Sequence, residues 1–260
     1  MLWEDLMSRV FGGMFRLAAL LGAGMCLGPS LAGQTPAAPA HNQLTAQEQR
    51  DGWKLLFDGK SLDGWRGYKK PDATGTRWKV DNGFLTLPPD DGKDTEGARD
   101  IISTATFEQF ELTWEWRIAQ AGNSGVKYFV LEDLPSAIGH EYQVIDDERH
   151  PDAKVGPKRQ TAAFYDVLGA SDRPLKPAGE LNTSRVVVKG HTVEHYLNGK
   201  RVLQYELDSP ALHAAIAASK FKDVARFGKL QNGHILLQDH GNQVWYRDIK
   251  IHVLPGKPVS

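Results

Sequence analysis

Two polar stretches of the sequence contain residue types that can move protons. The first, residues 140–146 (HEYQVID), has the alternation of a β-strand, on which Glu141 and Gln143 point to one face. Asp146 joins that face only if a bulge intervenes. Two carboxylates near an amide can divide acid and base roles, because different surroundings separate their pKa values. The same pattern also fits a merely exposed polar strand face.

The second stretch, residues 238–241 (QDHG), contains a histidine, the side chain whose charge changes near neutral pH. His240 is therefore either a proton acceptor and donor or only a hydrogen-bonding residue. Residues 122–125 (GNSG) predict a turn. Lys127 follows this turn and alternates with apolar neighbours, so it either shares a polar surface with Glu115 or is a solvated lysine.

Other chemistries are excluded by spacing or composition. Residues 191–195 (HTVEH) match a zinc signature that works on a helix, but their context predicts a strand. On a strand the two histidines would lie about 13 Å apart, too far to share one zinc ion. The single cysteine, Cys26, lies in an N-terminal apolar segment, so the rest of the chain offers no disulfide, thiolate nucleophile or thiolate metal ligand.

The elements that must position these residues are predicted to be strands. Residues 110–118 (FELTWEWRI) alternate apolar and polar side chains, which places Trp114 and Trp116 on the core face. Residues 245–253 repeat the alternation with one flaw, at Arg247. Period two dominates from residue 53 onward, which indicates a largely antiparallel β structure.

Turn signals support this interpretation. Asn82-Gly83 and Asn198-Gly199 lie between strand-like runs and predict hairpins, which require positive φ at the central residues. Residues 210–219 predict one short helix, with Ser209 as the N-cap and proline in the first turn. About a dozen short strands, with 26 Gly and 14 Pro, favour an all-β fold of two stacked antiparallel sheets, a jelly-roll sandwich.

The N-terminus has the composition of an export signal. Two arginines precede an apolar run of about a dozen residues and a small-residue cleavage site, and a membrane span needs about 20 residues. We therefore expect a signal peptide over residues 1–32, no stable membrane span, and a periplasmic or secreted product. Met1 and Met14 both fit as the start. Residues 33–50 are predicted to be a flexible leader, and residues 51–255 the folded domain.

The balance of charges limits the classes of molecule that the protein is expected to bind. Lys and Arg number 31 against 32 Asp and Glu, so there is no basic field to attract nucleic acid or anionic lipid. Neutral partners such as sugars fit better.

Several separated segments together resemble the 3-keto-disaccharide hydrolase family. The resemblance covers nearly the whole chain after the expected leader, in order. It rests on residues 52–65 (GWKLLFDGKSLDGW), 122–125, 140–146, 150–153 (HPDA), 164–166 (FYD), 176–180 (KPAGE), 237–241 (LQDHG) and 247–251 (RDIKI). It implies a concanavalin A-like jelly roll that is exported and acts on glycosides already oxidised at sugar C3 by a separate oxidoreductase.

The chemistry implied by this resemblance is elimination. A C3 ketone acidifies the C2 proton, a base removes that proton, the aglycone leaves from C1, and water adds afterwards. The strand at 140–146 has the spacing E-x-Q-x-x-D, whereas laminarinase-type glucanases have E-x-D-x-x-E. An elimination needs no carboxylate nucleophile, so it tolerates Gln143 where a two-carboxylate glycosidase would not.

Under this resemblance three side chains compete to be the base: Glu141, Asp146 and His240. The expected substrate-binding residues are Gln143, Gln238, Lys127, Glu115, His140 and Tyr165. The resemblance implies no definite cofactor. A divalent cation such as Ca²⁺, bound by carboxylates and carbonyls, stays open as an alternative, although no ligand pattern in the sequence indicates it. Two alternatives remain: a non-catalytic carbohydrate-binding module on the same fold, and an interaction domain with a large exposed apolar patch.

Overall fold

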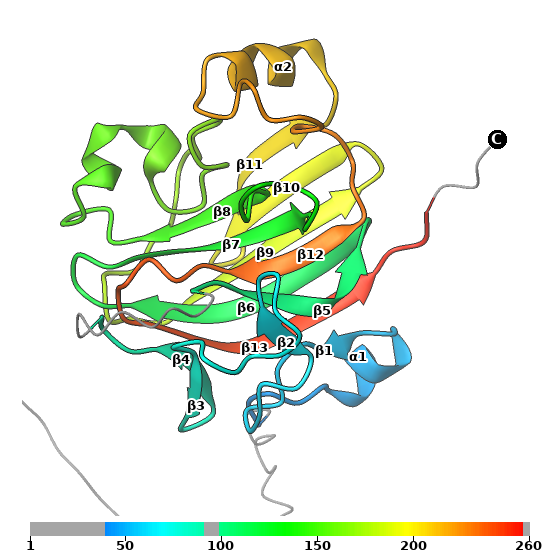
Figure 1. Ribbon diagram of the computed structural model, residues 1–260, viewed down its shortest axis with the longest axis vertical. Helices are drawn as coiled ribbons and strands as arrows, with labels where there is room; N and C mark the ends of the chain where they lie inside the picture. Colours follow the sequence, from blue (N-terminus) through cyan, green and yellow to red (C-terminus); the bar gives the residue numbers. More distant parts are fainter. Residues whose placement is uncertain (1–39, 91–98, 257–260) are drawn as a thin grey trace, which may run out of the picture. The chain divides into compact units, whose positions relative to one another are not determined.

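The computed structural model describes residues 40–90 and 99–256, which form two antiparallel sheets packed face to face (Figure 1). The expected all-β sandwich is therefore confirmed. The larger sheet has the order β11 (Lys200–Glu206), β10 (Thr192–Leu197), β9 (Asn182–Lys189), β6 (Phe110–Ile118), β13 (Val244–Val253), β4 (Phe84–Leu87), β3 (Lys79–Asp81), with β1 (Lys54–Leu55) also on β13. The smaller sheet has the order β2 (Trp65–Gly67), β5 (Ile101–Phe107), β12 (Gly233–Leu237), β7 (Asn123–Val130), β8 (His140–Ile145).

The core lies between the sheets and follows the alternation of the strands. In β6 every second residue from Phe110 to Ile118 is buried and the residues between them are partly exposed, as predicted. Trp114 and Trp116 are core residues. The Trp114 ring meets the Tyr142 ring of the opposite sheet edge-on, with centroids 5.0 Å apart. Large rings that interlock across the sandwich fix the spacing of the two sheets.

Both predicted hairpins form. Asn82 and Gly83 have φ values of 49° and 76°, and Asn198 and Gly199 have 47° and 83°. Two successive positive φ values match the twist of the strands that they join, β3 with β4 and β10 with β11.

Helical structure is short and lies at the edges. The predicted helix is confirmed as α2 (Pro210–Ala217), capped by the Ser209 side chain, which accepts the Leu212 N–H. The structure adds α1 (Ala46–Arg50) and two 3₁₀ turns, Asp152–Val155 and Pro157–Arg159. These turns belong to the long connection after β8 (Figure 1).

Residues 40–50, the described part of the expected flexible leader, are folded onto the domain. Asn42 is buried, and it exchanges backbone and side-chain hydrogen bonds with Asp248 while its amide donates to the Gly83 carbonyl at 2.9 Å. Asp248 has a φ of 51° at an irregularity in β13, which leaves its N–H free for the Asn42 side chain. The domain boundary at residue 51 is thus too late. The expected signal peptide, 1–32, lies outside the described residues.

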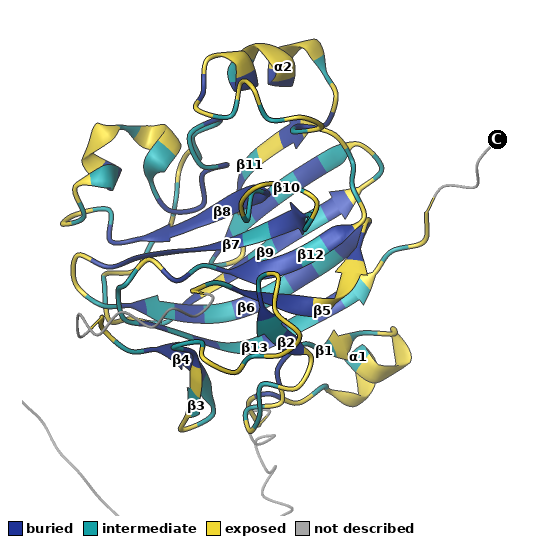
Figure 2. Ribbon diagram, viewed as in Figure 1, coloured by how far each residue is buried: buried dark blue, intermediate teal, exposed yellow. Residues whose placement is uncertain are grey.

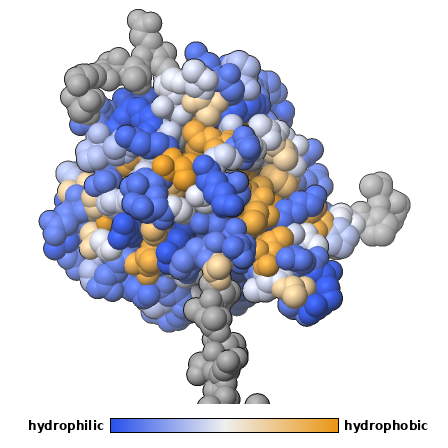
Figure 3. Space-filling view, turned by 90° about the horizontal axis from the view of Figure 1, so that it is seen from below, coloured by the Kyte–Doolittle hydropathy of each residue, from blue (hydrophilic) through white to orange (hydrophobic). Residues whose placement is uncertain are grey.

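The exposed hydrophobic residues and the helices of the described part of the chain bear on two expectations, the interaction domain and the absence of a membrane-spanning segment. Val155 and Val253 are the large hydrophobic residues exposed in this part of the chain, and the face in Figure 3 has hydrophobic residues interspersed with hydrophilic ones. Within residues 40–90 and 99–256 no helix has the length and hydropathy to cross a bilayer.

Candidate active site

A polar hollow lies on the outer face of the smaller sheet. Strand pairing sets Lys127 of β7 opposite Glu141 of β8, and Gln238, just past β12, donates its N–H to the Gly125 carbonyl. The volume of the hollow is about 430 Å³, within the range of small-ligand pockets. Its lining consists of Asp100, Lys127, Ser136, Ala137, Ile138, Gly139, Glu141, Lys220, Phe221, Val224 and Gln238.

Strand β8 is covered on both faces (Figure 2). Its outer edge is paired by the following connection, in which the Ala162 N–H donates to the Gln143 carbonyl and the Tyr165 N–H donates to the Glu141 carbonyl. Glu141 and Gln143 are consequently buried, with 5% and 1% of their surface exposed. The interpretation of an exposed polar strand face is therefore wrong.

Gly125 makes room for the Glu141 carboxylate. A Cβ atom on Gly125 would lie 2.4 Å from Glu141 Oε1, so the carboxylate occupies the space above this glycine. The predicted turn at 122–125 is only partly correct, because Asn123–Val130 is strand. The glycine is needed for close approach by a neighbouring side chain rather than for turn geometry.

Glu141 has Lys127 within ion-pair distance and shares the hollow with Lys220. Lys127 Nζ lies 3.8 Å from Glu141 Oε2 and donates to the Ala137 carbonyl at 3.1 Å. Burial raises the pKa of Glu141, and the Lys127 and Lys220 cations only partly oppose this effect. A carboxylate with a raised pKa is a stronger base than an exposed one, which suits general-base catalysis near neutral pH.

Lys220 reaches the hollow from the segment after α2. Its Nζ lies 4.2 Å from the centroid of the Tyr165 ring, and Tyr165 donates its hydroxyl to Asp152 Oδ2 at 2.8 Å. Arg159 holds the other oxygen of Asp152 at 2.7 Å. Burial lowers the pKa of Lys220, although Glu141 opposes the shift. The connection after β8 thus positions a cation beside Glu141.

Two buried side-chain oxygens on the outer face of the smaller sheet have no hydrogen-bond donor within the described part of the chain. The oxygens are Gln238 Oε1, in the hollow, and Asn123 Oδ1, two residues before Gly125 on the same face of β7. Buried acceptors without partners are costly unless a ligand supplies donors. Sugar hydroxyls are such donors.

Comparison with known proteins identifies the family. Residues 52–252 match the family described as the 3-keto-alpha-glucoside-1,2-lyase-like domain. The chain belongs to this family. The resemblance found in the sequence is thereby confirmed.

Relatives with known names or solved structures are similar to this chain over most of its length. A 3-keto-disaccharide hydrolase of Bacteroides thetaiotaomicron is 34% identical over 296 residues, which cover 95% of this chain and 100% of the relative. A solved candidate glycosyl hydrolase of Parabacteroides distasonis is 29% identical, covers 83% of this chain and 100% of its own, and superposes with a TM-score of 0.75. A second from that organism has 27% identity, 78% and 99% coverage, and a TM-score of 0.57.

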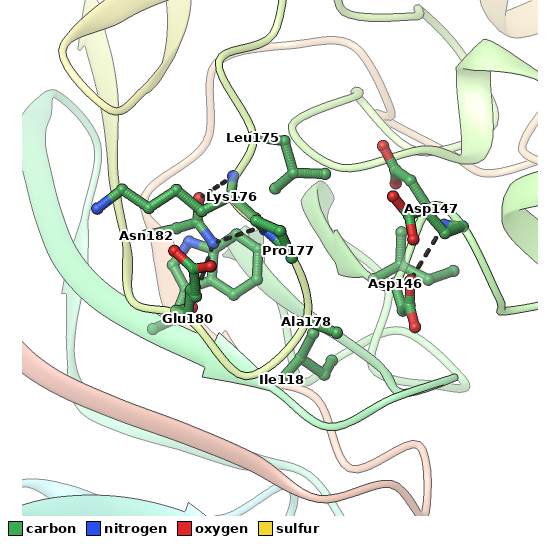
Figure 4. Close-up of a pocket in the computed structure, with 12 residues that line it drawn as sticks. Ile118, Asp146, Asp147, Leu175, Lys176, Pro177, Ala178, Glu180 and Asn182 are labelled. Carbon is green, nitrogen blue, oxygen red and sulfur yellow. Dashed lines mark hydrogen bonds between the residues drawn. The ribbon is translucent and has the colours of Figure 1, made fainter.

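Asp146 is a structural residue in this member of the lyase-like family. Its carboxylate accepts the N–H groups of Ala121 at 2.8 Å and Glu148 at 3.0 Å, and Arg149 lies 3.4 Å away. It lines a separate, smaller cavity of about 80 Å³, which also contains Asp147 (Figure 4). No bulge turns Asp146 onto the face of Glu141, so the structure does not bring these two carboxylates together.

His240 lies beside the hollow rather than in it. The residue is exposed, and its ring stands perpendicular to that of His150, with centroids 6.2 Å apart. His240 is not among the residues that line the hollow. Its position suits contact with an extended ligand better than proton transfer beside Glu141.

His140 faces the core, contrary to its expected binding role. Its Nε2 accepts the Gly228 N–H and its Nδ1 donates to the Tyr205 hydroxyl, both at 3.0 Å. This network of hydrogen bonds extends from the Tyr205 hydroxyl to the Tyr128 hydroxyl at 2.6 Å, and from the Tyr128 hydroxyl to His195 Nε2 at 2.9 Å. Burial lowers the pKa of His140 to about 3 and that of His195 to about 4, so both rings are neutral.

Glu115 lies on the other sheet. It points outward from β6 and accepts from Arg247 at 2.8 Å, so it cannot share a surface with Lys127. Glu115, His41 and Asp248 place possible metal-ligand atoms within 4.8 Å of one another. His41 is already 2.7 Å from Asp248, and this group is on the larger sheet, away from the hollow.

The structure therefore brings Glu141, Lys127 and Gln238 together in the hollow, and Tyr165 packs against Lys220. The other five predicted residues do not line it: Asp146, His240, Glu115, His140 and Gln143, whose buried side-chain oxygen accepts the Val144 N–H. The structure adds Asp100 and Lys220, which sequence reasoning missed. Asp100 precedes β5, and Lys220 follows α2. No local pattern marks either residue, because strand pairing and the fold of the α2 segment bring them to Glu141.

Proposed function

We propose that this protein cleaves the glycosidic bond of glycosides whose sugar is oxidised at C3, with Glu141 as the base. The observation that carries the proposal is a buried carboxylate with a raised pKa, held beside two lysines in a hollow of sugar size. The family membership and the relative named 3-keto-disaccharide hydrolase support the substrate class.

The proposed reaction begins with proton abstraction. The Glu141 carboxylate takes the C2 proton, which the neighbouring C3 ketone makes acidic, and negative charge develops on the ketone oxygen. Lys127, 3.8 Å from the carboxylate, and Lys220 supply positive charge for that oxygen. The C1–O bond then breaks, and a C1–C2 double bond forms.

Water completes the reaction. Addition of water to C1, with return of a proton to C2, converts the elimination product into the free 3-keto sugar. The net result with this step is hydrolysis, and without it a lyase reaction. Both outcomes use the same hollow, and the residues around Glu141 serve the first step in either case.

A direct two-carboxylate glycosidase mechanism has less support. It requires a second carboxylate at a set distance across the scissile bond. On β8 the central position is the amide Gln143, and Asp146 is occupied by backbone N–H groups and Arg149. The elimination avoids this requirement because its nucleophile is water and its base acts at C2.

A non-catalytic sugar-binding module has less support as well. Such modules present exposed aromatic faces to sugar rings, whereas Trp65, Trp78, Trp114 and Trp116 are buried. The two partly exposed tryptophans among the described residues already have partners, because Trp53 packs against His252 and Trp245 against Arg117. A buried carboxylate near cations has no evident use in binding alone.

We further propose that the protein is exported, on the composition of residues 1–32, and that a separate oxidoreductase supplies the 3-keto substrate. The second point follows from chemistry. An ordinary glycoside lacks the carbonyl that acidifies C2, so the C3 ketone has to be formed before the elimination.

The test is glucose release from 3-keto-trehalose and from unoxidised trehalose. We expect release from the keto sugar alone, and a loss of at least roughly 100-fold in Glu141→Gln. Glu115→Gln, the same change on the opposite sheet, is the matched control and should keep its activity. Release from trehalose itself, or an active Glu141→Gln, would refute the proposal.

A further inference from the structure

The hollow contains a second carboxyl group, Asp100, on the side away from Glu141. Pairing of Leu237 with Ile101 places Asp100 beside Gln238, at the start of β5. Strands β5, β12, β7 and β8 are consecutive neighbours, so Asp100 and Glu141 are attached three strands apart, about 14 Å across the sheet, and are offset by two residues along it.

One feature shortens the distance between these carboxyls, and a second links them electrostatically. The Glu141 carboxylate leans over Gly125 on β7, one strand closer to Asp100. Lys127, also on β7, is near enough to both groups to favour their charged forms. The hollow is thus lined by both carboxyls, with a lysine on a strand between them, and its volume of about 430 Å³ can hold a sugar ring.

The surroundings of Asp100 suit a carboxyl that holds a proton. Its Oδ1 accepts the Asp239 N–H at 2.9 Å, and Oδ2 has no hydrogen bond to any described residue. Burial raises the pKa of Asp100, and Lys127 and the Asp239 N–H oppose this effect only in part. By contrast Asp152 is held by Arg159 and the Tyr165 hydroxyl, which stabilise its charged form and lower its pKa despite burial.

We propose that Asp100 is the general acid that protonates the departing glycosidic oxygen, while Glu141 removes the C2 proton. This assignment rests on the proposed function. As the C1–O bond breaks, the electron pair stays on the oxygen and the Asp100 O–H proton moves to it. The aglycone leaves as a neutral alcohol, and Asp100 remains as a carboxylate near Lys127.

The second half of the reaction restores both groups. A water molecule adds to C1 and gives a proton to the Asp100 carboxylate, while protonated Glu141 returns its proton to C2. The sum consumes one glycoside and one water and produces a 3-keto sugar and an alcohol. No oxidant, reductant or further reactant is needed.

The test uses two substrates that differ only in the leaving group. A 3-keto-disaccharide releases a sugar alkoxide that needs a proton, whereas 4-nitrophenyl 3-keto-glucoside releases a stable phenolate. For Asp100→Asn we expect kcat/KM on the disaccharide to fall by roughly 100-fold or more, and on the nitrophenyl substrate by less than about tenfold. Glu141→Gln should lose both activities.

Two readouts separate acid catalysis from a structural role. The wild-type rate on the disaccharide should fall as pH rises through the pKa of Asp100, and this limb should vanish in Asp100→Asn. Asp133→Asn, an exposed carboxylate paired with Arg226, is the matched control and should match wild type on both substrates.

The assignment of Asp100 would be overturned if Asp100→Asn lost kcat/KM equally on the two substrates, or if it kept full activity on the disaccharide. Activity of the wild-type protein on the keto substrates would still support the proposed function in that case. A wild-type protein that cleaves neither keto substrate would instead refute the proposed function, and the acid role with it.

Discussion

The Glu141 carboxylate lies directly over Gly125 of the neighbouring strand, where its Oε1 is 2.4 Å from the position that a Cβ atom would take. The absence of a side chain on β7 therefore determines where the proposed base stands. This relationship joins two residues that the sequence separates by 16 positions (141 − 125), and strand pairing sets them on diagonal neighbours.

Gly125→Ala should displace the carboxylate without unfolding the protein, since a flexible side chain can move away from the added methyl group. We expect kcat to fall by roughly 100-fold, because a shift of about 1 Å in a reacting group costs that much. Steady-state kinetics on a 3-keto-disaccharide test this. Gly256→Ala, whose Cβ would meet its nearest atom at 3.6 Å, is the control, and an undiminished Gly125→Ala would contradict the placement of the base.

Lys127→Met should remove the cation that faces Glu141. We expect kcat to fall by roughly 100- to 1,000-fold through loss of charge stabilisation. The pKa of Glu141 should rise further, because Lys127 now lowers it, so the acid limb of the pH–rate profile should move to higher pH. The exposed Lys222→Met is the matched control. An unmoved acid limb would argue against Glu141 as the titrating base.

The buried histidines predict a loss of stability in acid. Their pKa values of about 3 for His140 and about 4 for His195 lie below the unfolded value near 6.5. Below pH 6.5 these histidines bind protons in the unfolded chain but stay neutral in the folded protein. The free energy of unfolding therefore falls as the pH drops from 6.5 toward 4. The loss is up to about 1.4 kcal/mol per pH unit for each histidine.

Thermal unfolding at pH 7, 6 and 5 tests this dependence. The exposed His191→Asn should reproduce the wild-type slope of Tm against pH, whereas His195→Gln, which removes a titrating ring, should flatten it. A His195→Gln slope equal to wild type would show that this ring is not the origin of the effect.

Asn42→Ala should weaken the attachment of the N-terminal segment to β13. It removes the side-chain bonds to the Asp248 N–H and the Gly83 carbonyl, and we expect a loss of about 1–3 kcal/mol in the free energy of unfolding. Urea denaturation measures it, with the exposed Asn232→Ala as control. Activity at saturating substrate should be unchanged, since this contact is on the sheet opposite the hollow.

The strand pattern was predictable wherever one face of a strand meets the core and the other meets water. In β6 the alternation of Trp114 and Trp116 with polar residues is read directly from the sequence. Strand β8 did not obey this rule, because the connection after it pairs with its outer edge and all of its residues are buried. The sequence therefore placed Glu141 and Gln143 correctly on one face of the strand, but the interpretation of that face as exposed was wrong.

The sequence by itself determined the sandwich, its hairpins and a short list of proton-transfer candidates that included Glu141. These depend on local periodicity, turn chemistry and residue type. Only the tertiary structure decided which candidates meet: it set Lys127, Asp100 and Lys220 around Glu141, turned His140 into the core, and placed Glu115 on the other sheet. The physical reason is that strand order and register, which determine neighbours across a sheet, arise from packing of the whole chain rather than from any local pattern.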